Sequence, residues 1–489
     1  MKAARRRGHA AIGGLLALGL LAGGIAAPGQ CAELHVGAAT TSITPDEPVA
    51  LSGQFGTRIA RKVESPCTAT ALALEAREGD KVVDQAIMVS CDLVAIRGTI
   101  QDQLRDKLQG KLDGFDLRKL FLNATHTHTG PVMLEGKYVI PAEGVMQPTE
   151  YVEFLLGRLS DVVVEAWKGR KPGGVSWALG HAVVGHNRRA VYADGTSVMY
   201  GKTNKPEFRH IEGYEDHAVE MLFFWDAEKK PTAMAINVVC PSQEVEGRSA
   251  VNADFWHEVR VALRERYGDD LCVLGWPGAA GDQSPHLMYR KAAEARMLKL
   301  RGLTRLEEIA RRIVAAVDDV FELARGDVRT DVVLKHRVED LQLPVQRVSD
   351  EQLAEAKAKA AEYASKPNPS TADRRRSKWH QAVVDRYEKQ DKEPIHPMEL
   401  HAIRLGDVAL ATNPFELFVD FGVQIKGRSK AVQTFIIQLA CASGIYVPTE
   451  RAVAGGGYSA IIQSNLVGPE GGQMLVERTL EEINAMWSE

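Results

Sequence analysis

Short apolar runs alternate along this chain with segments that have helical periodicity. Runs typical of β-strands lie at residues 70–74, 82–89, 120–122, 219–224, 233–239, 271–274, 400–405 and 408–411. Apolar residues recur at helical spacing over 99–109, 152–167 and 253–267, and Thr304-Arg305-Leu306-Glu307 has the pattern of a capping box that opens a helix to about Leu323. The alternation predicts an α/β fold in which mixed β-sheets are flanked by helices.

Residues 348–394 depart from this alternation. The segment is charged and rich in Ala and Lys, and Pro367-Asn368-Pro369 divides it in two. This pattern predicts a charged helical hairpin inserted between strands, and it favours a solvated helix pair without chemistry over a partner-binding site. Since no long Pro-, Gly- or Ser-rich linker occurs, residues 33–489 are expected to form one large domain.

The N-terminus has the pattern of a secretory signal peptide over residues 1–32. Lys2 and Arg5-Arg6-Arg7 precede a small-residue apolar run at 10–27, and Ala32 is a plausible cleavage position. We therefore expect an exported protein, periplasmic or secreted. No other stretch reaches 18 consecutive apolar residues, so the mature chain is expected to have no transmembrane segment.

Charge and cysteine content narrow the function further. Without the signal peptide, 56 Lys and Arg stand against 64 Asp and Glu, a net charge of −8, which argues against nucleic acid as a partner. Five cysteines then follow Cys31, an odd number for an exported chain. Cys91, Cys272 and Cys441 lie in apolar runs and are predicted to be buried thiols, whereas Cys240 ends a strand and precedes Pro241.

The first candidate for chemistry is the motif Asn123-Ala124-Thr125-His126-Thr127-His128-Thr129-Gly130-Pro131. In an extended backbone, residues i and i+2 point to the same side, so His126 and His128 would project together from a strand end. Two imidazoles on one face can bind a metal ion, or one can bind metal while the other transfers a proton. On this motif alone, a solvated or core histidine pair is an equally good explanation.

Further polar clusters also follow predicted strands, where a rigid sheet could hold catalytic groups on a common rim. Each has an ordinary structural explanation as well: a packed thiol, a helix N-cap, a charge at the rim or a strand aromatic. Ser284 is not in a Gly-x-Ser-x-Gly elbow, because Asp282 and His286 occupy the glycine positions. The clusters are Cys240-Pro241-Ser242-Gln243, the loop 276–286, Asn413-Pro414-Phe415-Glu416 and the segment 443–448.

Taken in order, these motifs resemble the neutral ceramidase family, zinc amidohydrolases that cleave the N-acyl bond of ceramide. The resemblance covers most of the mature chain, and its specific parts are the histidine motif and Gly281-Asp282-Gln283-Ser284-Pro285. It implies a catalytic domain of that fold without the family's C-terminal immunoglobulin-like domain. Supporting segments are 36–45, Asp92, Asn187-Arg188, Pro414-Phe415-Glu416 and Tyr446-Val447-Pro448-Thr449-Glu450.

The resemblance also implies a role for each matching residue. His126, Glu416 and Tyr446 would be zinc ligands, and Cys240 would occupy the place of the family's second zinc histidine. His128, Arg188 and Tyr458 would stabilise the oxyanion, with His128 passing the proton to the leaving amine. Ser284 matches an essential serine whose role could be nucleophilic or hydrogen bonding to a substrate hydroxyl.

Two departures from the family affect the expected reaction. A thiolate from Cys240 is a good zinc ligand, but it gives the metal more charge than imidazole does, so a bound water should be less acidified. The missing C-terminal domain weakens ceramide as the substrate. We therefore expect a Zn²⁺-dependent hydrolase of an N-acyl amide with a small-molecule or lipid-like acyl substrate. The alternatives are a zinc hydrolase of esters, lactones or carbohydrate-linked groups, and a degenerate binding protein.

Overall fold

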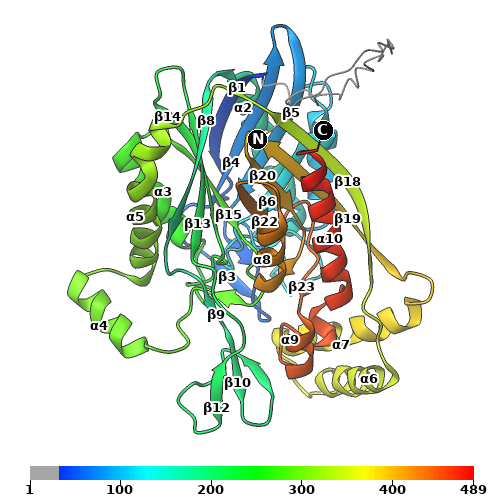
Figure 1. The fold of residues 1–489 in the computed structure, drawn as a ribbon. Helices are drawn as coiled ribbons and strands as arrows, with labels where there is room; N and C mark the ends of the chain where they lie inside the picture. Colours follow the sequence, from blue (N-terminus) through cyan, green and yellow to red (C-terminus); the bar gives the residue numbers. More distant parts are fainter. Residues whose placement is uncertain (1–31, 489) are drawn as a thin grey trace, which may run out of the picture.

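The computed structural model describes residues 32–488, and three β-sheets form its frame (Figure 1). Residues 1–31 of the predicted signal peptide lie outside the described part. The first sheet has the order β17-β1-β4-β5-β6, with β7 also paired to β1. Its strands are β1 (Ala32–Ser42), β4 (Thr68–Glu78), β5 (Lys81–Cys91), β6 (Leu120–Ala124), β7 (Lys171–Pro172) and β17 (Asp331–Val332).

The other two sheets have four strands each. One has the order β15-β14-β13-β8 and the other the order β18-β19-β20-β22. Their bounds are β8 (Gly174–His181), β13 (Ala218–Trp225), β14 (Pro231–Val238), β15 (Cys272–Pro277), β18 (Leu334–Pro344), β19 (Ile395–Leu405), β20 (Val408–Thr412) and β22 (Gln433–Ile437).

Helices cover the outer face of each sheet, and the inner faces share one core. On the outside, α2 packs on β1 and β4, α5 on β8, and α10 on β18 and β19. On the inside, Leu72, Phe224, Leu274, Ile403 and Phe435 belong to one buried apolar cluster, to which all three sheets contribute. The covering helices are α1 (Ile100–Leu108), α2 (Pro148–Lys168), α3 (Phe255–Tyr267), α5 (Arg305–Gly326), α8 (Val419–Arg428) and α10 (Pro469–Ala485). The predicted α/β class is thus confirmed.

Each sheet contains one pair of parallel strands, and these pairs position the candidate site. The pairs are β5 with β6, β14 with β15, and β20 with β22. Because parallel strands end at the same edge, the loops at their carboxyl ends gather there, as in other open α/β sheets. Those loops lead to every residue of the predicted site except Arg188, which follows β9 (His186–Asn187), and Tyr458, which follows α9 (Glu450–Gly455).

Smaller elements surround this edge. The sheet β10–β12 projects beyond it, and α6 and α7 lie beside it (Figure 1). The predicted charged hairpin is confirmed, because α6 and α7 pack against each other between β18 and β19. The remaining bounds are β2 (Val49–Leu51), β3 (Arg58–Ala60), β10 (Arg189–Tyr192), β11 (Ser197–Met199), β12 (Phe208–Ile211), β16 (Gln283–Ser284), β21 (Glu416–Leu417), β23 (Tyr446–Val447), α4 (Lys291–Arg301), α6 (Asp350–Ala364) and α7 (Thr371–Lys389).

Within residues 32–488 all five cysteines are free and buried, as the apolar context of three of them indicated. No helix in this part of the chain is both long and apolar enough to cross a membrane.

The stability that Glu308 on α5 contributes to the fold should depend on pH. Its buried carboxylate accepts hydrogen bonds from Arg311 and Arg312 on the same helix and from Arg301. The hydrogen bonds from Arg311 and Arg312 outweigh burial and lower the pKa of Glu308 to about 2. A carboxyl group whose pKa is lower in the folded state stabilises the fold above its unfolded pKa, and this contribution is lost as the pH falls.

We expect Glu308→Gln to lower the free energy of unfolding at pH 7 by about 1 to 2 kcal/mol, because the arginines are partly exposed and screened by solvent. The difference from wild type should shrink as the pH falls from 4.5 towards 2. Urea unfolding at several pH values measures both effects. Glu322→Gln on the exposed face of α5 is the control and should change stability by less than about 0.5 kcal/mol.

Candidate functional site

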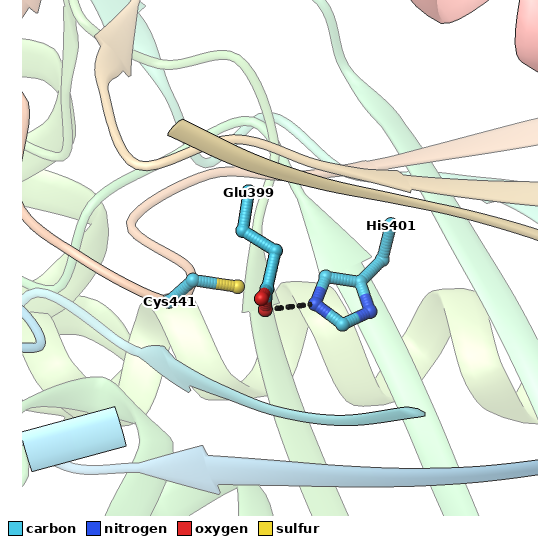
Figure 2. Close-up of side chains that lie close together, drawn as sticks. All are labelled: Glu399, His401 and Cys441. Carbon is cyan, nitrogen blue, oxygen red and sulfur yellow. Dashed lines mark hydrogen bonds and ion pairs between the residues drawn. The ribbon is translucent and has the colours of Figure 1, made fainter. Parts of the chain in front are cut away.

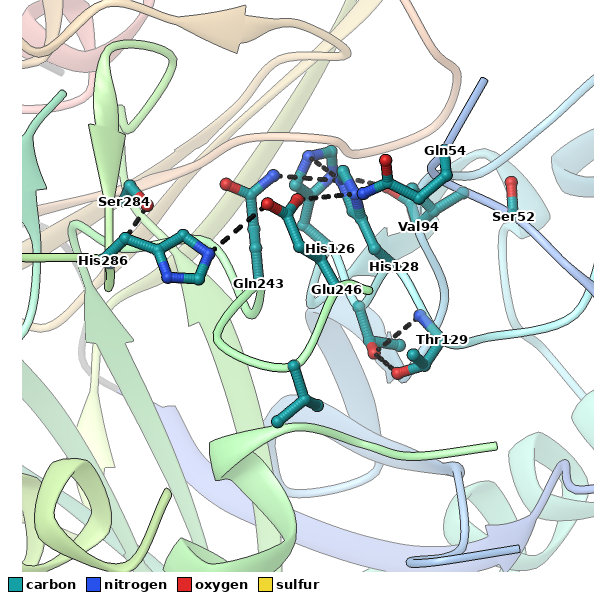
Figure 3. A network of polar contacts seen from close by, with 12 residues as sticks. Ser52, Gln54, Val94, His126, His128, Thr129, Gln243, Glu246, Ser284 and His286 are labelled. Carbon is teal, nitrogen blue, oxygen red and sulfur yellow. Dashed lines mark hydrogen bonds and ion pairs between the residues drawn. The ribbon is translucent and has the colours of Figure 1, made fainter. Parts of the chain in front are cut away.

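The site begins where β6 ends, with His126 and His128 facing Glu416. The His126 Nε2 atom lies 3.2 Å from His128 Nε2 and 3.4 Å from Glu416 Oε2. Figure 3 shows the two imidazoles together with Gln243 and Glu246. The structure thus brings the histidine motif next to a carboxylate that is 290 residues further along the chain.

The two histidines do not project from an extended strand, so the geometric argument from the sequence is wrong. Strand β6 stops at Ala124, and His126 has φ of 72°, in the left-handed region. The backbone turns because the amide of His126 donates to the carbonyl of Leu93 at 2.9 Å. The rings still meet, since the turn brings them edge to face with centroids 4.8 Å apart.

The hydrogen bonding of His126 leaves one nitrogen available as a ligand. His126 Nδ1 is 2.6 Å from the carbonyl oxygen of Val94. A carbonyl only accepts, so Nδ1 carries a proton, and in the neutral ring Nε2 has a free lone pair. This pattern, with the outer nitrogen held by a backbone carbonyl, is typical of metal-binding histidines. The lone pair points at a carboxylate oxygen and a second imidazole nitrogen, an arrangement that a cation would satisfy.

His128 is held by two side chains from the loop after β14. Gln243 Nε2 donates to His128 Nε2 at 3.0 Å, and Glu246 Oε2 lies 3.3 Å from His128 Nδ1. Burial lowers the pKa of His128 to about 4, and Glu246 only partly opposes this effect. The imidazole is therefore neutral at pH 7, with its proton on Nδ1 and its basic Nε2 facing the site.

Glu416 and Tyr446 are neighbours because β21 pairs in parallel with β23, which sets them opposite each other. Burial would raise the pKa of Glu416, but the protonated form of His126 and the guanidinium of Arg188 lower it to about 2. Burial and the carboxylate of Glu416 raise the pKa of Tyr446 well above its usual value. Arg188 Nη2 donates to the Tyr446 hydroxyl at 3.1 Å, which favours a phenolate if a metal ion displaces the proton.

Arg188 and Ser284 come from a second short strand pair, β9 with β16. Arg188 donates to the carbonyl of Gly281 at 2.8 Å, to Gln243 Oε1 at 3.0 Å and to the Tyr200 hydroxyl at 3.3 Å. Its Nε is buried without a partner. Ser284 Oγ accepts from the His286 amide at 3.1 Å and shares a hydrogen bond of 3.0 Å with the Tyr200 hydroxyl, in which either oxygen can donate.

Two glycines allow this close approach. Gly53 has φ of 100°, and a Cβ atom there would lie 2.5 Å from His128 Cγ. A Cβ on Gly281 would lie 2.2 Å from the carbonyl oxygen of Glu416. Only glycine therefore lets the loop after β15, which carries Ser284, lie directly against the backbone of the predicted ligand Glu416.

Cys240 occupies a different environment from the other predicted ligands. It is fully buried in the apolar cluster of α3 and α5, and its Sγ lies 3.5 Å from the carbonyl oxygen of Pro241. Burial raises the pKa of the thiol well above its usual value. Within residues 32–488, Cys240 does not form a group with His126 and Glu416 in which all ligand atoms lie within 4.8 Å of one another.

Tyr458 forms an aromatic wall beside Tyr446. The two rings have centroids 5.9 Å apart, and Tyr458 also contacts Phe55 at 6.2 Å and Trp379 of α7 at 5.7 Å. Burial raises the pKa of Tyr458 to about 12, so its hydroxyl is a donor at neutral pH. The charged hairpin is thus more than a solvated helix pair, because α7 helps to build this wall.

Within residues 32–488, a separate group of Glu399, His401 and Cys441 has ligand atoms close enough to hold a metal ion, a criterion that His126, His128 and Glu416 together do not meet (Figure 2). The ligand atoms of this separate group all lie within 4.8 Å of one another. His401 Nε2 is 2.7 Å from Glu399 Oε1, and its Nδ1 is 2.8 Å from His336 Nε2. Arg105 also donates to both oxygens of Glu399, so a metal ion here would share that carboxylate with a guanidinium.

Four residues of the site had no assigned role in the sequence motifs: Tyr200, Gln243, Glu246 and His286. Glu246 lies between His128 and His286, since its Oε2 is 3.3 Å from His128 Nδ1 and its Oε1 is 3.4 Å from His286 Nε2. Gln243 and His286 stand in polar clusters that the sequence did indicate, whereas Tyr200 and Glu246 lie in segments without any such signal. Two cavities, of about 670 and 480 Å³, border Glu244, Glu246 and His286 and give solvent access to this side.

Comparison with solved structures identifies the fold. The chain superimposes on the crystal structure of neutral ceramidase from Pseudomonas aeruginosa with a TM-score of 0.67 and 16% identity, covering 93% of this chain and 74% of that one. A ceramidase complexed with C2 gives a TM-score of 0.66 and 15% identity, covering 94% and 76%. No protein-family model matches the chain, and no curated protein matches it in sequence. The chain therefore has the neutral ceramidase fold.

Proposed function

We propose that this protein is an exported Zn²⁺-dependent hydrolase that cleaves an N-acyl amide bond. The observation that carries the proposal is the cluster of His126, His128 and Glu416, in which a lone pair on His126 Nε2 faces a carboxylate and a second imidazole. The neutral ceramidase fold supports the same reaction class, because the solved proteins of that fold are ceramidases.

The donor set fits zinc at three of the four positions. His126, Glu416 and Tyr446 would hold the ion, and imidazole, carboxylate and phenolate oxygen are suitable donors. Cys240 would be the fourth ligand only if its side chain turned away from the Pro241 carbonyl. When bound, zinc would polarise the acyl carbonyl and lower the pKa of a coordinated water.

The chain's own groups would complete the reaction. His128, which is neutral and basic at Nε2, would accept the proton released as water adds to the acyl carbon and pass it to the leaving amine. The protonated Tyr458 hydroxyl and the unpartnered Nε of Arg188 are the donors available to the developing charge on the acyl oxygen. Ser284, which is hydrogen-bonded to the Tyr200 hydroxyl, would attack the acyl carbon or bind a substrate hydroxyl.

Metal analysis and turnover of the purified protein test the proposal together. We expect zinc close to one equivalent per chain, and hydrolysis of a panel of N-acyl amides, including ceramide, that stops on chelation and returns with added Zn²⁺. Ester and lactone substrates in the same panel test the alternative reaction classes. Turnover that is unaffected by chelation, or a protein that binds zinc but hydrolyses no acyl compound, would contradict the proposal.

Glu246 is expected to act as a positioning residue for His128. Burial would raise the pKa of Glu246, but His128 and His286 outweigh it and hold that pKa well below its usual range, so the carboxylate stays charged. Replacing it by glutamine weakens the orientation of the imidazole without removing a metal donor. We expect Glu246→Gln to lower kcat about 10- to 100-fold with unchanged zinc content and little change in KM.

The matched control for this prediction is Glu244→Gln. Glu244 lines the same cavities, but its Oε2 lies 3.7 Å from His286 Nδ1, and it has no contact with His128. Glu244 is not one of the groups proposed to take part in the reaction, so its substitution should leave kcat within about twofold of wild type. Equal losses in the two variants would show that Glu246 acts only through the general charge of the loop.

A further inference from the structure

Three cationic side chains from different segments lie close enough beside the site to act on one another electrostatically. Arg97 follows β5, Lys137 lies in the loop after the histidine motif, and Arg375 belongs to α7. Lys137 also directly precedes Tyr138, whose hydroxyl accepts a hydrogen bond from Arg375. Arg97 Nη1 donates to Ser443 Oγ at 2.6 Å, and this serine is three residues before Tyr446. Arg97 is also three residues after Val94, whose carbonyl holds His126. The cluster is thus attached to both sides of the candidate metal centre.

Arg375 joins this cluster from the hairpin. It donates to the Tyr138 hydroxyl at 2.6 Å and to the carbonyl of Gln54, and its guanidinium lies 5.1 Å from the ring centroid of Phe55. Phe55 in turn contacts Tyr458, the residue proposed to donate to the acyl oxygen. A continuous path of packed side chains therefore joins Arg375 to the reacting position.

Among residues 32–488, none of the three forms an ion pair with a carboxylate. Arg97 and Arg375 instead contact hydroxyls, a carbonyl and a ring. The Nε of Arg97 is buried and makes no hydrogen bond. Charged groups that leave water normally gain an opposite charge or a full set of hydrogen bonds, because desolvation is costly. A bound anion would supply the negative charge and the hydrogen-bond acceptors that these side chains lack.

Among the described residues, Glu416 is a carboxylate that acts electrostatically on both Arg97 and Lys137. Burial, Arg97 and Arg375 lower the pKa of Lys137 to about 7, and Glu416 only partly offsets them. If Glu416 binds zinc, as proposed, its charge is committed to the metal ion. The loaded site would then hold a dication and two guanidinium groups with still less compensating charge, and an anion bound beside Lys137 would favour the protonated form of that lysine.

We propose that Arg97, Lys137 and Arg375 form an anion subsite, so that the substrate of this hydrolase is an N-acyl amide with a negatively charged group close to the scissile bond. The simplest member of this class is an N-acyl amino acid, in which a carboxylate stands one carbon from the amide nitrogen. This inference rests on the proposed function, and it separates the substrate from ceramide, which has no charged group.

A matched substrate pair tests the subsite in the zinc-loaded full chain. N-decanoylglycine and N-decanoylglycinamide have the same shape and differ in charge. We expect kcat/KM to be at least tenfold higher for the carboxylate. Lys137→Met should remove about tenfold of kcat/KM for N-decanoylglycine and leave the glycinamide unchanged, because one charge-assisted hydrogen bond is lost. Lys137→Glu should reverse the preference.

The control variant is Lys359→Met on α6, a partly exposed lysine whose partner is Glu362 on the same helix. It should leave both substrates unaffected. N-decanoyltaurine, with a sulfonate in place of the carboxylate, distinguishes a site for any anion from one shaped for a carboxylate. Either preference supports the subsite, provided that it depends on Lys137.

A binding measurement separates failure of the subsite from failure of the proposed function. Decanesulfonylglycine and its glycinamide replace the scissile amide by a sulfonamide, so calorimetry can measure their affinity without turnover. Binding of the anionic compound that is lost in Lys137→Met, without hydrolysis of any N-acyl substrate, would overturn the function and keep the subsite. Equal hydrolysis of the charged and neutral pair, unchanged in Lys137→Met, would overturn the subsite and keep the function. Absence of both binding and hydrolysis would overturn both.

Discussion

His126→Ala should abolish both zinc binding and hydrolysis. The Val94 carbonyl holds Nδ1 of His126 and directs its Nε2 towards Glu416. Without His126, the proposed metal centre loses the donor that the fold orients best. Since a metal ion contributes several kcal/mol of transition-state stabilisation, we expect kcat/KM to fall on the order of 10³-fold or more. Elemental analysis and initial rates measure the two effects.

The companion variant His128→Gln distinguishes metal binding from proton transfer. Glutamine keeps a hydrogen-bonding side chain beside Gln243 and Glu246 but has no basic nitrogen. We expect full zinc content with a 10²- to 10⁴-fold loss of kcat, the range of general acid–base catalysis. If His128→Gln loses zinc and His126→Ala retains it, the assignment of the two histidines is reversed.

The fourth coordination position of the proposed zinc ion depends on whether Cys240 is a ligand. Its thiol is directed at the Pro241 carbonyl in a fully apolar cluster. If the side chain turns on metal binding, Cys240→Ser should lower zinc affinity sharply, because a hydroxyl is a poor replacement for thiolate. Unchanged zinc content in Cys240→Ser would remove Cys240 from the ligand set and leave His126, Glu416 and Tyr446 with an open position for water.

The sequence predicted the fold class because strand and helix periodicities are local properties. Every strand and helix expected from the apolar pattern is present, within a few residues at each end, and the capping box at Thr304 does open α5. Strand β18 was missed, because its alternating charged residues, such as Lys335, Arg337 and Glu339, resemble an exposed segment. Its exposed face is stabilised by pairing with β19 rather than by its own apolar content.

From the sequence, only those site residues that lie in recognisable motifs could be predicted. The His-x-His motif and Gly281-Asp282-Gln283-Ser284-Pro285 identified positions, but no periodicity shows that the backbone turns at His126. Residues such as Glu246 and Lys137 have no motif, because their roles follow from contacts between segments far apart in the chain. Tertiary packing also gave α7 a part in the site, although its charged sequence suggested only a solvated helix.

The buried ion pair of Asp92 and Arg260 is where we expect the largest loss of stability. Arg260 on α3 donates to both oxygens of Asp92 at 2.7 and 3.1 Å, and the two side chains are 3% and 0% exposed. Asp92 also accepts from Thr68 on β4 and from Thr125, which precedes His126. We expect Asp92→Ala to lower the free energy of unfolding by about 3 to 5 kcal/mol, because the guanidinium of Arg260 is left buried without its partner.

The unpaired charge of Arg260, rather than the lost side-chain volume, should account for the loss of stability in Asp92→Ala. The double variant Asp92→Leu with Arg260→Met replaces the pair by apolar side chains, and it should be more stable than Asp92→Ala alone, because no charge is then left buried. Glu477→Gln breaks the exposed bidentate pair with Arg428 and should leave the urea midpoint unchanged.

Since Thr125 loses its acceptor in every Asp92 variant, any folded variant should also show a raised KM or reduced zinc affinity through displacement of His126. Wild-type stability in Asp92→Ala would mean that water reaches Arg260 and that the pair is not closed to solvent.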